Sequence, residues 1–262
     1  MIDLQTLTKI ANTQEIDTNT IYREYVQIRF LQEIYHTVTP GSIYFKGGTA
    51  LRLIFGSERF SEDLDFTIPG NKIKANMVVR ESVKRLTQEF PDIYCKDVKT
   101  IIGYCSKLYL HGINSTFPLT IKLDFSMREH IIEPQTSPLQ HTSLATDIVL
   151  VEHISKSEIL AEKFRAVSSR KKGRDLYDIW YLLHSDTVLS IHLINQKLAY
   201  YHEHFDLDNI IESVHSYNEK ELYDDLARFL PKSKRKIIQE LKRLVLDILK
   251  SKISDNISNS TL

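Results

Sequence analysis

Apolar residues recur at steps of three and four between residues 21 and 38, which is the spacing of an amphipathic helix. The positions that follow this spacing are Ile21, Tyr25, Ile28, Leu31 and Tyr35. A Thr-Pro-Gly sequence follows directly at residues 39–41 and is a helix stop signal. The pattern therefore predicts a long helix that ends near residue 38.

Short strands and helices alternate in the next hundred residues. Glycine and proline pairs separate the apolar runs, and residues 94–127 are strand-like throughout. We expect strands over residues 42–45, 63–68, 100–110 and 116–126, and helices over residues 49–55 and 72–90. Residues 133–143 contain two prolines and many polar side chains, so we expect a linker or long loop there.

The C-terminal part of the chain has a helical pattern. Ser155-Lys-Ser-Glu158 has the form of a capping box and should start the first of these helices. We expect helices over residues 155–168 and 174–184 and further helices to about residue 250, with a polar, frayed tail over residues 251–262. The fold class is then α+β, with a small mixed β-sheet core flanked by helices in residues 1–150 and a helical bundle in residues 151–262.

The composition is that of an ordinary globular protein. Lys plus Arg and Asp plus Glu both number 34 in 262 residues, and 42% of the residues are apolar. These values exclude a disordered chain and a polycation, so any contact with nucleic acid requires a local basic patch. No apolar run approaches the ~18 residues of a membrane span. With no secretory signal either, we expect a cytoplasmic protein without a membrane partner, in which Cys95 and Cys105 are reduced thiols.

The most informative segment begins with Phe45-Lys46-Gly47-Gly48-Thr49, between a predicted strand and a predicted helix. Glycines at such a point let the backbone approach a ligand closely, because no β-carbon intervenes. The start of the following helix offers free amide groups to a phosphate. Taken alone, however, a glycine pair is also consistent with an ordinary turn.

Two aspartates follow on the next predicted strand. Asp63 and Asp65 share one face of that strand, whereas Leu64 and Phe66 take the other. Neighbouring carboxylates repel each other, and a divalent cation such as Mg²⁺ relieves the repulsion while also binding substrate phosphates. Alone, the pair could simply face solvent. Together with the glycine pair, it predicts a phosphate cradle beside a metal site.

A third carboxylate is a candidate for the same site. Residues 116–126 alternate between apolar and polar positions, and Asp124 is the only acidic residue among them. It could complete the metal shell, or act as the general base on an attacking hydroxyl. The alternative is a plain solvent-facing residue, and that is the reading we prefer for its neighbour Lys122.

The strongest local positive bias lies in residues 156–175, with seven Lys or Arg against three acidic residues. Within it, Lys163 falls among the apolar positions of its helix, where an unpaired charge is costly. Binding a triphosphate would explain it, and snorkelling to the surface is the alternative. Asp175 and Asp178 share a flank of the next helix, and Arg174 could form a simple helical ion pair with Asp178.

These motifs together resemble a known family. The order of a glycine pair, about a dozen residues and Asp-x-Asp resembles the signature of the polymerase-β-like nucleotidyltransferase superfamily. The fuller strings KGGTALRL and RFSEDLDF, with AEKFRAV and RDLYDIW further on, resemble the AbiEii/AbiGii toxin nucleotidyltransferases of type IV toxin–antitoxin pairs, to which MenT-type toxins are related. The likeness is good over residues 40–70 and 155–185 and weaker between them.

The resemblance implies a set of roles. Lys46, Gly47, Gly48, Thr49, Ser61 and Lys163 would bind the nucleotide, and Asp63, Asp65 and Asp124 would bind Mg²⁺ or Mn²⁺. An aspartate of the RDLYD run would also be essential, and the sequence does not separate Asp175 from Asp178. The substrate would be an NTP and the acceptor the 3′ end of tRNA, another RNA, or a protein hydroxyl. A cognate antitoxin would be the partner.

Two other functions are compatible with these residues. A metal-dependent nuclease could use Asp63, Asp65 and Asp124, but it leaves the glycine pair unexplained. A nucleotide-binding or antitoxin-like module could keep the fold without turnover, although the intact aspartates and Lys163 argue against it. Two further clusters, residues 202–204 (His-Glu-His) and the basic residues 232–236, are interpreted as solvated stretches, with metal and RNA contacts as their respective alternatives.

Overall fold

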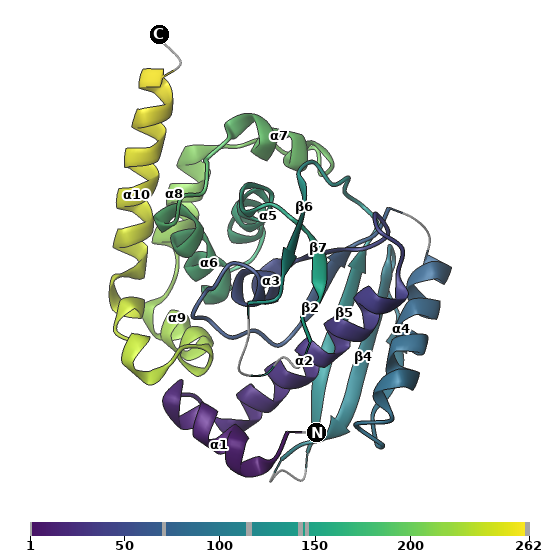
Figure 1. Ribbon diagram of the computed structural model, residues 1–262. Coiled ribbons are helices and arrows are strands. Elements are labelled where there is room, and N and C mark those ends of the chain that lie inside the picture. The colour runs from purple at the N-terminus through teal and green to yellow at the C-terminus, as the bar shows by residue number, and fades with distance from the viewer. Residues whose placement is uncertain (1, 70–71, 114–116, 141–143, 145–146, 260–262) are drawn as a thin grey trace. The chain divides into compact units, whose positions relative to one another are not determined.

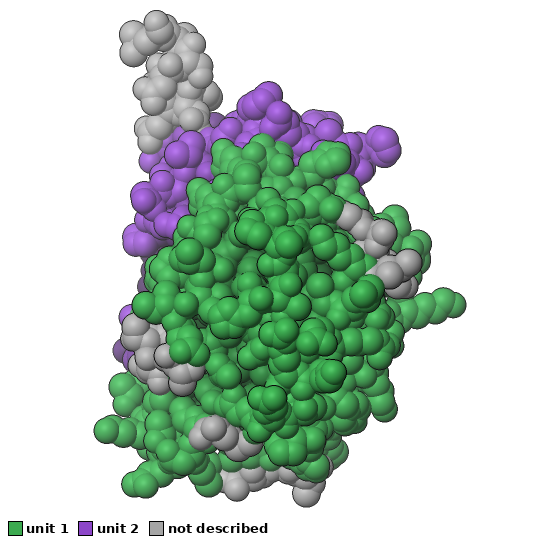
Figure 2. Space-filling model, turned by 45° about the vertical axis from the view of Figure 1, so that its right-hand side comes forward, with its two compact units in different colours: residues 1–154 green, residues 155–262 purple. Residues whose placement is uncertain are grey.

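The chain divides into two compact units, Met1–Ile154 and Ser155–Leu262 (Figure 2). The computed structural model describes residues 2–69, 72–113, 117–140, 144 and 147–259. The sequence suggested a division at residue 150. The first unit instead continues to Ile154, because its last strand pairs with other strands of that unit.

The first unit contains a mixed β-sheet with helices packed on it (Figure 1). Its helices are α1 (Leu4–Thr13), α2 (Thr18–Thr37), α3 (Gly47–Leu53) and α4 (Lys72–Leu86). Its strands are β1 (Tyr44–Lys46), β2 (Leu64–Thr67), β3 (Tyr94–Val98), β4 (Tyr104–His111), β5 (Pro118–Ser126), β6 (Pro134–Pro138) and β7 (Leu150–Ile154). In the described residues these seven strands lie in the order β3-β4-β5-β2-β1-β7-β6.

Strand pairing at the centre of the sheet explains why it is mixed. Strand β2 pairs antiparallel with β1 and parallel with β5, and β1 pairs parallel with β7. The predicted alternation along β5 is confirmed, because Leu119, Ile121, Leu123 and Phe125 are buried and the residues between them are half-exposed. The buried side chains lie on the face that α2 and α4 cover, where Phe125 stacks on Phe66.

The expectation of a loop over residues 133–143 was wrong in part. Residues Pro134–Pro138 form strand β6, which pairs antiparallel with β7 at the edge of the sheet. An edge strand tolerates proline because one side of its backbone needs no hydrogen bond, so the two prolines are compatible with a strand here. The expected strand over residues 100–110 begins only at Tyr104, and a separate strand, β3, precedes it.

The second unit is helical in its described residues, as expected. It comprises α5 (Lys156–Ser169), α6 (Gly173–His184), α7 (Ile191–Ala199), α8 (Leu207–His215), α9 (Glu219–Leu226), two short 3₁₀ turns (Ala227–Phe229 and Lys232–Lys234) and α10 (Ile237–Asn259). Helix α10 runs beyond the expected end at residue 250. Leu249 anchors it in the core, and each residue added to an existing helix needs no new nucleation.

The predicted helix start at Ser155 is confirmed by the side-chain cap of α5. The Ser155 hydroxyl accepts a hydrogen bond from the Glu158 amide at 3.1 Å. The Glu158 carboxylate is buried against Lys197, at 2.8 Å from its Nζ, so tertiary packing gives it a partner that the capping box does not include. Among the described residues, no helix has both the length and the apolar character needed to cross a bilayer.

Candidate active site

The glycine pair lies at the junction of β1 and α3, and each glycine is required by a side chain that packs against it. Gly47 has φ +76°, a conformation that favours glycine. A β-carbon there would overlap the carboxylate of Asp65. A β-carbon at Gly48 would overlap the guanidinium of Arg59 and lie 3.2 Å from the Ser61 hydroxyl. The backbone at residues 47–48 therefore lies directly against the acidic segment.

The predicted carboxylates come together at the centre of the sheet. Asp65 on β2 is in register with Lys46 on β1 and with Asp124 on the neighbouring parallel strand β5. Residues in register on adjacent strands are about 4.8 Å apart and project to the same face. Asp63 comes directly before β2, and its carbonyl accepts a hydrogen bond from the Thr49 hydroxyl. Hydrogen bonding and packing thus tie the glycine loop to both aspartates.

The donor set fits a hard divalent cation that shares its shell with a substrate. Among the residues that the structure describes, no group of three His, Cys, Asp or Glu side chains is placed to hold a metal by itself. Mg²⁺ does not need such a group, because it is usually held by one or two carboxylates together with waters and substrate phosphates. Asp65 and Asp124 provide two carboxylates on one face, beside a loop without side chains.

Two lysines lie beside these carboxylates and are paired with acidic groups. Lys122 donates to Asp124 over 2.5 Å. Burial by itself lowers the pKa of Lys122, but this hydrogen bond and the surrounding negative charges raise it above its ordinary value. Lys46 donates to Glu129 at 3.3 Å and is largely buried. The sequence reading of Lys122 as a simple solvated charge misses its contact with Asp124.

Two further residues of this region lie close to the glycine pair and the carboxylates. Arg59 is 2% exposed and donates to the Phe60 carbonyl at 2.8 Å. Its position behind Gly48 explains why that glycine is needed. Cys105 is in register with Asp124, and burial and the nearby carboxylates raise the pKa of its thiol. Both cysteines are free thiols, as predicted.

In the second unit, Lys163 forms ion pairs with both candidate aspartates. Its Nζ lies 2.8 Å from Asp175 and 2.7 Å from Asp178. Arg170 also binds Asp175, at 2.9 Å. Burial by itself raises the pKa of Asp175, but Lys163 and Arg170 hold it well below its usual range. The position of Lys163 on an apolar face is therefore explained by two buried carboxylates from α6.

Lys163 does not reach the surface by snorkelling, and Arg174 contacts a carboxylate of another helix. Asp178 is fully buried against Lys163, and the Lys163 side chain is 12% exposed. Arg174 lies against Asp225 of α9, with 4.0 Å between Nε and the carboxylate. The structure thus places Asp175 and Asp178 in one cluster with Lys163, and each contacts the lysine directly.

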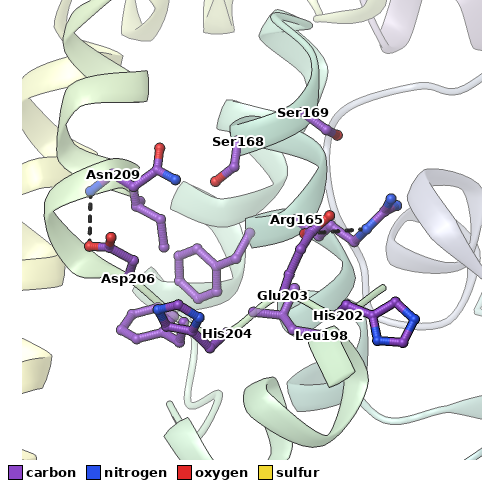
Figure 3. Close-up of a pocket in the computed structure, with 12 residues that line it drawn as sticks. Arg165, Ser168, Ser169, Leu198, His202, Glu203, His204, Asp206 and Asn209 are labelled. Atoms are coloured by element: carbon purple, nitrogen blue, oxygen red, sulfur yellow. Dashed lines mark hydrogen bonds and ion pairs between the residues drawn. The ribbon is translucent and has the colours of Figure 1, made fainter. Parts of the chain in front are cut away.

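A pocket of about 360 Å³ lies within the second unit, between the C-terminal part of α5, the end of α7 and the start of α8 (Figure 3). Arg165, His202 and His204 are among its lining residues, and Arg165 pairs with Glu203 at 3.5 Å. None of the site residues predicted from the sequence lines it. His202, Glu203 and His204 are exposed, which agrees with their interpretation as a solvated stretch, and the described residues include no group of three possible ligands that could hold a metal ion here.

The fold is that of the nucleotidyltransferase toxins. Over 94% of this chain and 90% of the other, the structure resembles MenT4, the nucleotidyltransferase toxin Rv2826c from Mycobacterium tuberculosis H37Rv, with a TM-score of 0.65 at 16% identity. It also resembles JHP933 from Helicobacter pylori, with a TM-score of 0.58 at 21% identity over 94% of this chain and 98% of that one.

The sequence gives the family directly. Residues 29–243 match the model of the nucleotidyl transferase AbiEii toxin of type IV toxin–antitoxin systems, and the chain belongs to this family. No curated protein matches the sequence significantly. The family resemblance inferred from the two pairs of motifs is thereby confirmed, and the family implies an NTP substrate and a cognate antitoxin.

Proposed function

We propose that this protein is a metal-dependent toxin that transfers a nucleotide from an NTP to an acceptor hydroxyl, with the 3′ end of tRNA as the acceptor. The observation that carries the proposal is the packing of Gly47 against the Asp65 carboxylate, with Asp124 in register on the next strand. A loop that can take phosphates and carboxylates that can take a divalent cation are then adjacent in one unit.

Each group in this unit has a chemical task in the proposal. Lys46, Gly47, Gly48 and Thr49 hold the triphosphate, with Ser61 beside Gly48 as a further hydrogen-bonding group. Asp63, Asp65 and Asp124 are the candidate carboxylates for Mg²⁺ or Mn²⁺, which would complete its shell with substrate phosphates and water rather than be held by the three side chains alone. When bound, such an ion neutralises phosphate charge and favours an in-line displacement. In that displacement the acceptor oxygen bonds to the α-phosphorus, the bond from that phosphorus to the β-phosphate bridging oxygen breaks, and pyrophosphate leaves.

Asp124 is the group best suited to receive the proton of the acceptor hydroxyl. Its side chain is 41% exposed, so an incoming hydroxyl can reach it. It is also held by Lys122, which keeps the carboxylate oriented. On this reading Asp124 acts as general base, in addition to any part it has in holding the cation.

The Lys163 cluster is proposed as the second essential group. By its match to the family motif, Lys163 contacts nucleotide phosphates. Asp175 and Asp178 hold its ammonium group in a fixed position. The proposed reaction takes place in the cytoplasm, where NTPs, tRNA and the cognate antitoxin are available.

The test is incorporation of label from each of the four α-³²P NTPs into total tRNA by purified protein with Mg²⁺. We expect labelled RNA with at least one NTP, and no labelling with EDTA or by Asp65→Asn. Asp208→Asn, which changes an exposed aspartate on α8, is the matched control and should label normally.

The same assay separates the rival functions. A nuclease would shorten the tRNA without any NTP, and a binding module would bind NTP in calorimetry without labelling anything. Folded protein that labels neither RNA nor protein with any of the four NTPs would contradict the proposal.

A further inference from the structure

A row of lysines crosses the face of the sheet opposite to α2 and α4. Lys96 on β3 is in register with Lys107 on β4, and Lys107 with Lys122 on β5. Since residues in register project to the same face of adjacent strands, the three side chains form a line perpendicular to the strands. Asp97, next to Lys96, contacts Arg80 of α4 at 3.1 Å, so Lys96 projects away from that helix.

This row leads from the free edge of the sheet to the candidate active site. Strand β3 is at the edge, and all three lysines are exposed or half-exposed. At the inner end, Lys122 donates to Asp124, which is in register with Asp65. The row of lysines therefore lies directly beside the carboxylates, on the same face of the sheet.

Two tyrosines stand beside the lysines on this face. Tyr94 and Tyr109 are in register on β3 and β4, and their rings are stacked with centroids 5.2 Å apart at an interplanar angle of 10°. The Lys96 ammonium lies 5.5 Å from the centroid of Tyr94 and 5.7 Å from that of Tyr109. Tyr94 is 46% exposed, so a further flat ring can extend the stack at the sheet edge.

We propose that this lysine–tyrosine surface (Tyr94, Lys96, Lys107, Tyr109 and Lys122) binds single-stranded RNA. It holds the acceptor strand so that the terminal hydroxyl reaches Asp124, and this second part rests on the proposed function. Phosphates pair with the lysines, and unpaired bases stack on the tyrosines, which is how grooves for single strands combine charge with aromatic rings. Because the whole chain is neutral, the attraction must come from a local surface of this kind.

The first test is binding of a fluorescent RNA 12-mer without NTP, measured by anisotropy over a range of salt concentrations. For single strands each phosphate contact contributes about 0.7 to the slope of log K against log salt. The double variant Lys96→Ala/Lys107→Ala should therefore reduce the slope by about 1.4 and weaken binding roughly tenfold or more at ~0.1 M salt. The control Lys9→Ala/Lys84→Ala removes two exposed lysines from α1 and α4, and equal loss in both doubles would overturn the proposal.

The second test concerns the bases. Tyr94→Ala should weaken RNA binding at least about fivefold, as expected for loss of one stacked base, whereas Tyr94→Phe should retain it. An RNA duplex and a polyglutamate peptide of equal charge should compete poorly with the 12-mer. Competition by polyglutamate as strong as by RNA would show a surface for acidic proteins and overturn the assignment to RNA.

A transfer assay separates failure of this inference from failure of the proposed function. Lys96→Ala/Lys107→Ala should raise the KM for RNA, while kcat at saturating RNA falls much less and the KM for NTP changes little. If this double variant labels RNA with the KM of the wild type, the proposed RNA-binding surface is refuted and the proposed function is unaffected. If neither the wild type nor any variant labels an acceptor, but the variants lose RNA binding, the assignment of this surface to RNA is supported and the transferase proposal fails.

Discussion

At the scale of single residues, the candidate site is defined by side chains that occupy the space next to its two glycines. The requirement for glycine at position 47 comes from a positive φ and from the Asp65 carboxylate that occupies the space of a β-carbon. At position 48 it comes from the buried guanidinium of Arg59. These constraints link the residue types of two separate motifs, which is why the motifs are informative together and ambiguous apart.

Gly47→Ala should abolish nucleotide transfer and destabilise the protein. Gly41→Ala is a matched control, because Gly41 has φ +79° but the nearest atom to an added β-carbon is the Tyr44 hydroxyl oxygen at 3.9 Å. A strained backbone of this kind costs about 1–3 kcal/mol in both variants. Gly47→Ala should cost more in urea unfolding, and only it should lose activity in the labelling assay. Normal transfer by Gly47→Ala would contradict the proposed cradle.

Asp175 should make the stability of the protein depend on acid. Its folded pKa lies below the unfolded value of about 4. Its stabilising contribution is therefore complete above that pH and is lost as the pH falls below it. Urea unfolding of the wild type between about pH 6 and pH 3 should show this loss, and Asp175→Asn should flatten the acid limb.

The control for that experiment is Asp186→Asn. Asp186 pairs with Lys156 at 2.8 Å, but its side chain is 90% exposed. Pairs exposed to solvent contribute little to stability. The pH curve of this variant should stay close to that of the wild type, and a change as large as that of Asp175→Asn would show that burial is not the cause.

At the scale of elements, packing between helices decides features that local preference does not. Glu158 has the position of a capping-box acid, and its carboxylate also pairs with Lys197 from α7. Gly173 begins α6 without a positive φ, and it lies where α6 and α9 approach closely. Each of these residues joins helices that are distant in the sequence but adjacent in the second unit.

Gly173→Ala should destabilise the second unit, although alanine normally favours a helix over glycine by about 0.5–1 kcal/mol. The added β-carbon would lie 2.8 Å from Leu222 Cδ1 and 3.2 Å from the Leu222 carbonyl oxygen. Overpacking of this kind costs about 1–3 kcal/mol, so the sign of the effect is reversed. Thermal unfolding measures it, with the exposed Lys171→Ala as control. A higher thermal stability of Gly173→Ala than of the wild type would show that α6 and α9 can move apart at little cost.

At the scale of the whole molecule, charge is balanced overall and separated locally. The 34 basic and 34 acidic residues cancel, so the chain has no general attraction for nucleic acid. Carboxylates gather at the centre of the sheet, and lysines lie beside them on the same face. With this distribution of charge, any attraction for nucleic acid is confined to local surfaces.

Expression of the wild-type chain in cells should arrest growth, and expression of Asp63→Ala should not. The reason is that toxicity in the proposal requires the metal site, so removal of one carboxylate removes the arrest. Growth curves after induction, with protein levels matched by immunoblot, measure the effect. Asp208→Asn should arrest growth like the wild type. Equal arrest by Asp63→Ala would separate toxicity from the proposed chemistry.

The sequence by itself determined the class of the fold and the family. Apolar periodicity defined α2, β5 and the helical second unit, because a regular element with one buried face must repeat its apolar side chains. The glycine pair, the Asp-x-Asp pair and the KGGT and RDLYD strings indicated the family, since the residue types at a phosphate and metal site are restricted by chemistry. Pattern alone missed β6, because a proline-bounded edge strand looks like a loop.

Only the tertiary structure decided which distant residues meet. The contact of Gly47 with Asp65, the burial of Arg59 behind Gly48 and the ion pairs of Lys163 with both Asp175 and Asp178 all depend on packing between different elements, which the sequence pattern does not specify. The lysine–tyrosine surface likewise depends on strand register, which aligns residues of β3, β4 and β5. Periodicity reports which face a side chain takes, whereas its partner is fixed by the register and packing of the folded chain.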